Sequence, residues 1–266
     1  MSAATAVALK NVARRFVTPS GDVLSALENF DLAIAPGEFC AIVGPTGCGK
    51  STTLGLVSGL AQPQGGTVTL FDAPVTGVDR RVGFVFQQDA VFPWRDVLGN
   101  VMAGPLFRGV PRAKAEAEAR DWIARVGLTG FEHHHPHQLS GGMRKRVALA
   151  QTFINKPEVL LMDEPFSALD VQTRELMQEE LLTLWTQSGA AVLFVTHDLD
   201  EAILLADRVA VLTTRPARVK SVHTIDLPRP RNIGTLRYDE RFVAIARRLS
   251  DDLRDEVLRA RREAMA

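Results

Sequence analysis

The sequence predicts an α/β fold with a mostly parallel sheet, an N-terminal antiparallel β subdomain and an inserted α-helical subdomain. Short apolar runs such as residues 39–43 and 159–162 alternate with helical segments, as buried parallel strands do. Two alternating runs, residues 7–12 and 23–34, flank a loop of turn-forming residues, which indicates a hairpin. A helical stretch interrupted by Pro and Gly, at about residues 88–155, separates the core strands.

The composition is typical of a globular protein without a strong charge bias. The chain has 266 residues, of which 46% are hydrophobic and 23% charged, and its formal net charge is zero. A zero net charge gives no support for nucleic acid as a partner. No stretch approaches the ~20 continuous apolar residues of a membrane helix, and the N-terminus lacks the pattern of a signal peptide. We therefore expect other polypeptides to supply any membrane-spanning helices.

A phosphate-binding loop follows the apolar strand at residues 39–43. Residues 44–51 match the pattern G-x-x-x-x-G-K-[ST] without a mismatch, and a helix is expected directly after them. This strand–loop–helix context separates a nucleotide site from a chance Gly-rich turn, so a P-loop NTPase core is predicted. Backbone N–H groups of such a loop bind phosphates, while Lys50 supplies a cation and Ser51 a hydroxyl for Mg²⁺. The predicted nucleotide-binding residues of the loop are Gly44, Pro45, Thr46, Gly47, Cys48, Gly49, Lys50, Ser51 and Thr52.

The remaining elements follow from the same hydrophobic patterns. An amphipathic helix is expected at residues 113–126, and Gly189 is expected to end a helix that begins near residue 171. Further strands are expected at residues 67–70, 82–86, 191–196 and 208–212, and further helices at residues 144–155, 199–206 and from 239 onward. We expect a nucleotide-binding domain over residues 1–225 and a C-terminal helical extension over residues 226–266.

Two carboxylates, Asp163 and Glu164, end the apolar strand at residues 159–162. Strands of a parallel sheet end together, so Asp163 should lie beside the phosphate loop and hold Mg²⁺ with Ser51, directly or through water. Glu164 should lie one residue further, where it can polarise a water in line with the γ-phosphate. Alone, such a pair is often a solvated strand end, but beside a phosphate loop it indicates nucleotide hydrolysis.

The cysteines and a histidine-rich segment have simpler interpretations. A disulfide between Cys40, in the buried strand, and Cys48, in the phosphate loop, would distort the nucleotide site, so reduced thiols and a cytoplasmic setting are expected. Four histidines at residues 133–137 suggest a metal site, but no Cys or carboxylate partners stand at matching spacing. A solvated loop is therefore expected there.

Five further motifs in order give the chain a resemblance to ATP-binding-cassette ATPases over about residues 7–225. The motifs are Leu139-Ser140-Gly141-Gly142-Met143, which resembles the signature motif, Ser167-Ala168-Leu169-Asp170, which resembles the D-loop, His197 as the switch histidine, Gln87 as the Q-loop glutamine, and Phe16 as the adenine-stacking aromatic. Met143 and Lys145 stand where Gln is more common in the family, and neither change removes a phosphate donor. Residues 1–225 would then be the cassette domain, with the helical subdomain inserted at about 88–155.

The resemblance implies that ATP binds between two copies of the chain. Ser140, Gly141 and Gly142 precede a helix, so their N–H groups can form a second anion site at its N-terminus. Two copies facing head to tail would place each ATP between one phosphate loop and the partner's signature motif. Hydrolysis would then release the two copies from one another.

The resemblance also implies a role for each site residue. The implied catalytic residues are Glu164, His197, Lys50 and Gln87, and the implied metal ligands are Ser51, Gln87 and Asp163. The implied ATP contacts outside the phosphate loop are Phe16, Gln87, Asp163, Ser140, Gly141, Gly142 and Asp170. Two of these have plain alternatives, because Phe16 can be a core aromatic and Gln87 an ordinary polar strand end.

Residues 92–94, 137–144 and 163–170 resemble the branch of the family that powers importers of nitrate, sulfonates, taurine and related small anions. This implies an ATPase subunit at the cytoplasmic face of the inner (cell) membrane that works with two transmembrane permease subunits and, indirectly, a solute-binding protein. The alternative is an ATPase of a lipid-organising or non-transport complex that uses ATP-gated dimerisation. Residues 92–94 fit either plain packing or a groove for a partner's helix.

Overall fold

The fold is built around a central six-stranded sheet. The structure is a computed structural model and describes residues 4–264. The strand order is β10-β9-β3-β8-β7-β6, and all neighbouring strands are parallel except β10, which is antiparallel to β9. The strands are β3 (Phe39–Val43), β6 (Val82–Val85), β7 (Val159–Asp163), β8 (Ala191–Val195), β9 (Arg208–Leu212) and β10 (Val219–Thr224). The predicted α/β fold with a mostly parallel sheet is confirmed.

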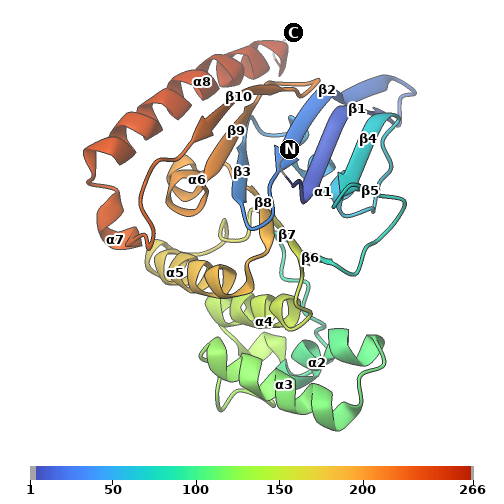
Figure 1. The fold of residues 1–266 in the computed structure, drawn as a ribbon, viewed down its shortest axis with the longest axis vertical. Helices are drawn as coiled ribbons and strands as arrows, with labels where there is room; N and C mark the ends of the chain where they lie inside the picture. The colour runs from blue at the N-terminus through green and yellow to red at the C-terminus, as the bar shows by residue number, and fades with distance from the viewer. Residues whose placement is uncertain (1–3, 265–266) are drawn as a thin grey trace.

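A second, antiparallel sheet packs beside the first, as Figure 1 shows. Its strands, in the order β2-β1-β4-β5, are β2 (Val23–Ile34), β1 (Val7–Val17), β4 (Gly65–Leu70) and β5 (Ala73–Pro74). The predicted hairpin is present, but β1 runs to Val17 instead of ending near Val12. Cross-strand pairing continues through Phe16 and Leu24, where β1 is exposed and the alternation of polar and apolar residues that predicts a strand is lost.

Three helices between β6 and β7 form the lower part of the molecule in Figure 1: α2 (Val97–Phe107), α3 (Arg112–Arg125) and α4 (Gly141–Phe153). The predicted amphipathic helix corresponds to α3, which buries Ala115, Ala119 and Ile123 at four-residue spacing. Asp96 begins α2, because its Oδ1 accepts a hydrogen bond from the Gly99 N–H at 2.7 Å. A short 3₁₀ turn, Pro136–Gln138, leads into α4.

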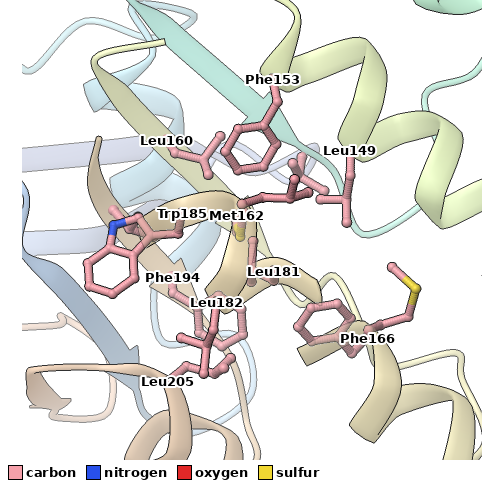
Figure 2. Packing of buried hydrophobic residues seen from close by; sticks show 14 of the residues in the cluster. Leu149, Phe153, Leu160, Met162, Phe166, Leu181, Leu182, Trp185, Phe194 and Leu205 are labelled. Atoms are coloured by element: carbon pink, nitrogen blue, oxygen red, sulfur yellow. The ribbon is translucent and has the colours of Figure 1, made fainter. Parts of the chain in front are cut away.

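The main core lies between the parallel sheet and helices α4, α5 (Val171–Ser188) and α6 (Leu199–Leu205), as Figure 2 shows. Trp185 of α5 packs edge-on against Phe39 at 5.3 Å between ring centroids and donates its indole N–H to the Ala190 carbonyl. Each large apolar side chain buried here contributes about 1.5–3 kcal/mol. Gly189 ends α5 in the left-handed conformation, as predicted.

The C-terminal segment packs on the same core. The expected final helix is present as α8 (Glu240–Ala264), which follows the short helix α7 (Ile233–Leu236) and contacts α6 and β9. Arg231 is buried and donates to the carbonyls of Ile203, Leu204 and Ala206 at the end of α6. Burial lowers the pKa of Arg231 to about 10.

Two features of the sheet differ from the expectations. Strand β10 was not predicted, because four of its six residues are polar. Phe86, expected inside a buried strand, lies just beyond the end of β6 and is 42% exposed. Within residues 4–264, no helix is both long enough and apolar enough to cross a membrane.

Candidate nucleotide-binding site

The phosphate loop connects the end of β3 to helix α1 (Lys50–Val57). The side chain of Lys50 is buried, and its Nζ donates to the carbonyl oxygens of Gly44 at 2.9 Å and Pro45 at 3.1 Å. These bonds hold the ammonium against the loop, next to the first N–H groups of α1. A cation and a helix N-terminus that converge in this way form an anion site.

Close packing explains why the loop needs glycine. Gly47 and Gly49 have φ angles of 73° and 130°, which side-chain-bearing residues rarely adopt. A Cβ on Gly49 would stand 2.9 Å from Cδ2 of Leu27 and 3.1 Å from the carbonyl oxygen of Ala26. Strand β2 therefore buttresses the phosphate loop from the antiparallel sheet.

One cation near the loop was missed by the sequence reasoning. Arg215 lies in the turn after β9, and its Nη2 is 3.9 Å from the position that a Cβ on Gly47 would occupy. The position of Arg215 could have been predicted, because it follows the strand at residues 208–212, which was expected to end at the same edge of the sheet as the phosphate loop.

Asp163, the last residue of β7, meets the loop through a hydrogen bond from Ser51. Burial raises the pKa of Asp163 and the neighbouring Glu164 adds to the rise, whereas the Ser51 hydrogen bond and the Lys50 charge oppose it. A carboxylate and a hydroxyl in contact are oxygen ligands of the kind that Mg²⁺ prefers. The residues present therefore fit a magnesium ion.

Three polar side chains gather at the carboxyl ends of β6, β7 and β8. The Glu164 Oε2 atom lies 3.0 Å from Nδ1 of His197 and accepts a weaker hydrogen bond from Nε2 of Gln87 at 3.5 Å. Glu164 has a φ of 41°, and its N–H donates to the Val195 carbonyl. This left-handed turn directs the carboxylate toward the other two side chains, so the structure brings together residues that are 33 and 77 positions apart in sequence.

Phe16 lies on β1, 41% exposed, with the guanidinium of Arg14 4.9 Å from its ring centroid. Arg14 pairs across the sheet with Leu27, whose side chain adjoins Gly49. The exposure speaks against the alternative that Phe16 is a core aromatic. A stacking role on adenine stays a prediction.

The signature and D-loop motifs lie next to each other at two helix N-termini. Ser140 caps α4 by accepting from the Met143 N–H at 3.2 Å, and Asp170 caps α5 by accepting from the Thr173 N–H at 3.0 Å. The Thr173 hydrogen bonds lower the pKa of Asp170. A Cβ on Gly142 would stand 2.8 Å from Cγ2 of Thr173, so the first turns of α4 and α5 are closely packed.

Among the described residues, these caps make no polar contact with the phosphate loop of their own chain. Within residues 4–264, no hydrogen bond or ion pair joins Ser140, Gly141 or Gly142 to residues 44–51. The two separate half-sites that the resemblance implies, the phosphate loop and the signature motif, stay a prediction.

The histidine segment and the cysteines belong to no metal-binding cluster in the part of the chain that the structure describes. No group of three or more His, Cys, Asp or Glu side chains is arranged to hold a metal there. His133 is exposed and pairs with Asp96 at 3.3 Å. Cys40 and Cys48 are buried free thiols, and burial raises the pKa of Cys40 to about 12 and also raises that of Cys48.

Solved structures of ATP-binding cassettes are similar to this one. A cassette in a dimeric, post-hydrolysis state bound to ADP and Pi is 32% identical, with a TM-score of 0.73 over 84% of this chain and all of that chain. A dimeric bacterial ABC transporter cassette is 31% identical, with a TM-score of 0.74 over the same shares of both chains.

Sequence relatives and the family match agree with the structural likeness. An uncharacterised ABC transporter ATP-binding protein of Methanocaldococcus jannaschii is 46% identical over 91% of this chain and 89% of its own. The taurine import ATP-binding protein of Burkholderia thailandensis is 42% identical over 88% and 91%, and that of Yersinia pestis 45% identical over 73% and 76%. Residues 27–167 match the ABC transporter family. The chain therefore belongs to the ABC transporter family and is an ATP-binding subunit with ATPase activity.

Proposed function

We propose that this ATPase energises an importer of a small anion or organic solute of the nitrate, sulfonate or taurine kind. The solute class is supported by the relatives that carry the name taurine import ATP-binding protein. In this proposal the subunit works at the cytoplasmic face of the inner membrane, with two permease subunits that a solute-binding protein supplies. Residues 1–225 act as the cassette domain and residues 226–266 as a helical extension.

The proposed chemistry assigns a task to each group at the edge of the sheet. Lys50 binds the phosphates, and Ser51 and Asp163, together with Gln87, would hold Mg²⁺. When bound, the ion would supply positive charge that offsets the charge of the phosphoryl group. Glu164 orients the attacking water and accepts its proton, a role supported by the position of its carboxylate between His197 and Gln87.

We propose that the complete site forms only in a dimer. The supporting observation is that Ser140, exposed at the N-terminus of α4, has no bonded link to the phosphate loop of its own chain within the described residues. Related cassettes have been solved as dimers. In the proposed arrangement Ser140, Gly141 and Gly142 bind the partner's ATP, and Asp170 lies between the two sites.

A groove of about 510 Å³ beside the Q-loop supports docking of a permease helix. Phe84, Phe86, Phe92 and Phe107 line it, with the rings of Phe84 and Phe86 stacked at 4.1 Å. Trp94, which is 72% exposed, lies against Phe92, with 5.5 Å between the ring centroids. Exposed aromatic side chains that surround an apolar groove are typical of sites that bind an amphipathic helix.

The Glu164→Gln variant tests the ATPase mechanism. We expect this variant to bind ATP, to lose at least ~10³-fold in turnover, and to accumulate as an ATP-dependent dimer, because the amide cannot accept the proton of the attacking water. Light scattering with and without ATP and steady-state phosphate release measure both effects. Full turnover by the variant would contradict the role proposed for Glu164.

Co-purification tests the transport assignment separately. The unmodified subunit, expressed in its own host, should co-purify with two membrane subunits. The Trp94→Ala protein should co-purify with smaller amounts of them. Recovery of a lipid-organising or non-membrane complex instead would overturn the importer proposal and leave the ATPase mechanism intact.

A further inference from the structure

A buried lysine joins helix α4 to the segment that follows β6. Lys145 is 4% exposed, and its Nζ lies 2.8 Å from Oδ1 of Asp89 and donates to the carbonyl oxygens of Phe86 and Gln87, each at 3.4 Å. A buried ammonium is tolerated only when acceptors and an opposite charge surround it. Here all three acceptors belong to one short segment, so the lysine fixes that segment to the helix.

Each end of this contact carries a residue of the proposed site. The segment includes Gln87, whose side chain reaches Glu164 at the carboxyl end of β7. Lys145 lies five positions after Ser140, within the second turn of α4. The contact therefore connects Gln87, a proposed Mg²⁺ ligand in one half-site, with the helix whose N-terminus is proposed to form the other half-site.

Arg144 adds a second connection at the same place. Its Nη1 donates to the Leu139 carbonyl at 2.7 Å, and its Nε lies 3.6 Å from Oδ2 of Asp89. Asp89, whose side chain is 19% exposed, is held by two consecutive cations of helix α4, the signature helix. One of these cations also holds the backbone that immediately precedes Ser140.

We propose that Lys145 and Asp89 form a strap that makes the Q-loop and the signature helix move as one unit. Lys145 is then a positioning residue that couples ATP binding at one half-site to the orientation of Ser140, Gly141 and Gly142 toward the partner's ATP. The inference rests on the proposed dimeric function. The physical reason is that separating a buried ion pair leaves uncompensated charge, so the two segments keep their relative positions.

Nucleotide binding by the monomer and ATP-driven dimerisation respond differently to loss of the strap. Monomer binding uses the phosphate loop alone, so Lys145→Met and Asp89→Asn should leave the affinity for a fluorescent ATP analogue within about twofold of normal. In the Glu164→Gln background, each change should raise the ATP concentration for half-maximal dimerisation about tenfold, a fold-change typical of coupling between sites. Combining the two changes should add little, because both remove the same contact.

Two further variants make the test specific. Lys114→Met removes an exposed lysine of α3 and should change neither affinity nor dimerisation. Lys145→Gln retains a donor for the Phe86 and Gln87 carbonyls but loses the ion pair, so its effect on dimerisation should be intermediate. If the Lys145→Met protein does not fold, dimerisation of the Lys145→Gln and Asp89→Asn proteins still tests the proposed coupling.

Several outcomes would contradict the proposed role of Lys145 and Asp89. Normal dimerisation of Lys145→Gln and Asp89→Asn would do so, as would an equal loss of monomer affinity and dimerisation, which indicates a structural role only. Additive effects in the double variant would show that the two residues act separately. Failure of the Glu164→Gln protein itself to dimerise with ATP would instead count against the proposed function.

Discussion

Gly49 shows how a single residue controls the phosphate loop. Its φ of 130° and the 2.9 Å approach of Leu27 leave no room for a side chain. We expect Gly49→Ala to lower the free energy of unfolding by about 1–3 kcal/mol and to abolish ATP binding, because strain and steric overlap act together. Urea unfolding and titration with a fluorescent nucleotide measure these effects.

Gly55 provides the matched control within α1. A Cβ at this position would meet only the Ala61 Cβ, at 4.0 Å, so Gly55→Ala should be neutral or stabilise the protein by up to about 1 kcal/mol. Normal stability and normal nucleotide affinity of the Gly49→Ala protein would contradict the prediction, because they would show that the loop can accommodate a side chain at this position.

The negative charge of Asp163, a residue of the candidate site, destabilises the folded protein. Its pKa is raised by burial, so the folded protein holds its proton more tightly than the unfolded chain. Any stabilisation from this group is present below the ordinary pKa of 3.8 and is lost as the pH rises through the raised value. At neutral pH the ionised carboxylate therefore lowers the stability of the protein without nucleotide.

Asp163→Asn tests this cost. The amide keeps a partner for Ser51 and carries no charge, so at pH 7 the Tm without nucleotide should rise by about 2 °C, while ATPase activity falls at least ~10³-fold because the metal ligand is gone. The gain in Tm should shrink at a pH below the ordinary carboxyl pKa of 3.8, where the native carboxyl is protonated. Calorimetry at both pH values decides the matter, and a lower Tm at pH 7 would contradict the prediction.

At the scale of elements, a buried carboxylate attaches α8 to the core. Glu256 is 4% exposed, accepts from the Thr214 N–H at 3.0 Å and pairs with Lys220 of β10 at 3.3 Å. Glu256→Ala should lower the free energy of unfolding by about 2–4 kcal/mol, because a buried amide and an ammonium lose their acceptor. Asp255→Ala, on the same helix but with an 80% exposed side chain, should change it by less than about 0.5 kcal/mol.

Denaturant unfolding of the two variants separates these effects. Equal stability of Glu256→Ala and Asp255→Ala would mean that α8 is held by its apolar face alone, through residues such as Phe242 and Leu249. That result would make the C-terminal helix an ordinary amphipathic addition to the core.

At the scale of the whole molecule, the two half-sites predict a specific defect in assembly. Ser140→Arg places a bulky side chain at the exposed N-terminus of α4, where the partner's ATP is proposed to bind. In the Glu164→Gln background this change should abolish the ATP-dependent dimer and leave nucleotide binding by the monomer within about twofold, since the phosphate loop is untouched. Ser250→Arg, at an exposed position on α8, should dimerise normally. Dimer formation by the Ser140→Arg protein would refute the head-to-tail arrangement.

The local features of this protein could be predicted from its amino-acid sequence. The phosphate loop, the acidic residues after the strand at 159–162 and the helix end at Gly189 depend on contiguous residues and on the period of apolar side chains. The meeting of Gln87, Glu164 and His197 was also predictable, because parallel strands end at one edge of a sheet. The ordered motifs further indicated the family that the relatives and the structures confirm.

Contacts between residues far apart in the sequence became visible only in the folded chain. Lys145, met in the sequence as a departure from a common Gln, is buried against the segment that carries Gln87, 58 positions earlier. Arg215 reaches the phosphate loop, and Glu256 joins α8 to the turn after β9. Each of these contacts depends on where two elements pack in three dimensions, and hydrophobic periodicity carries no information about that placement because it reports only which face of one element is buried.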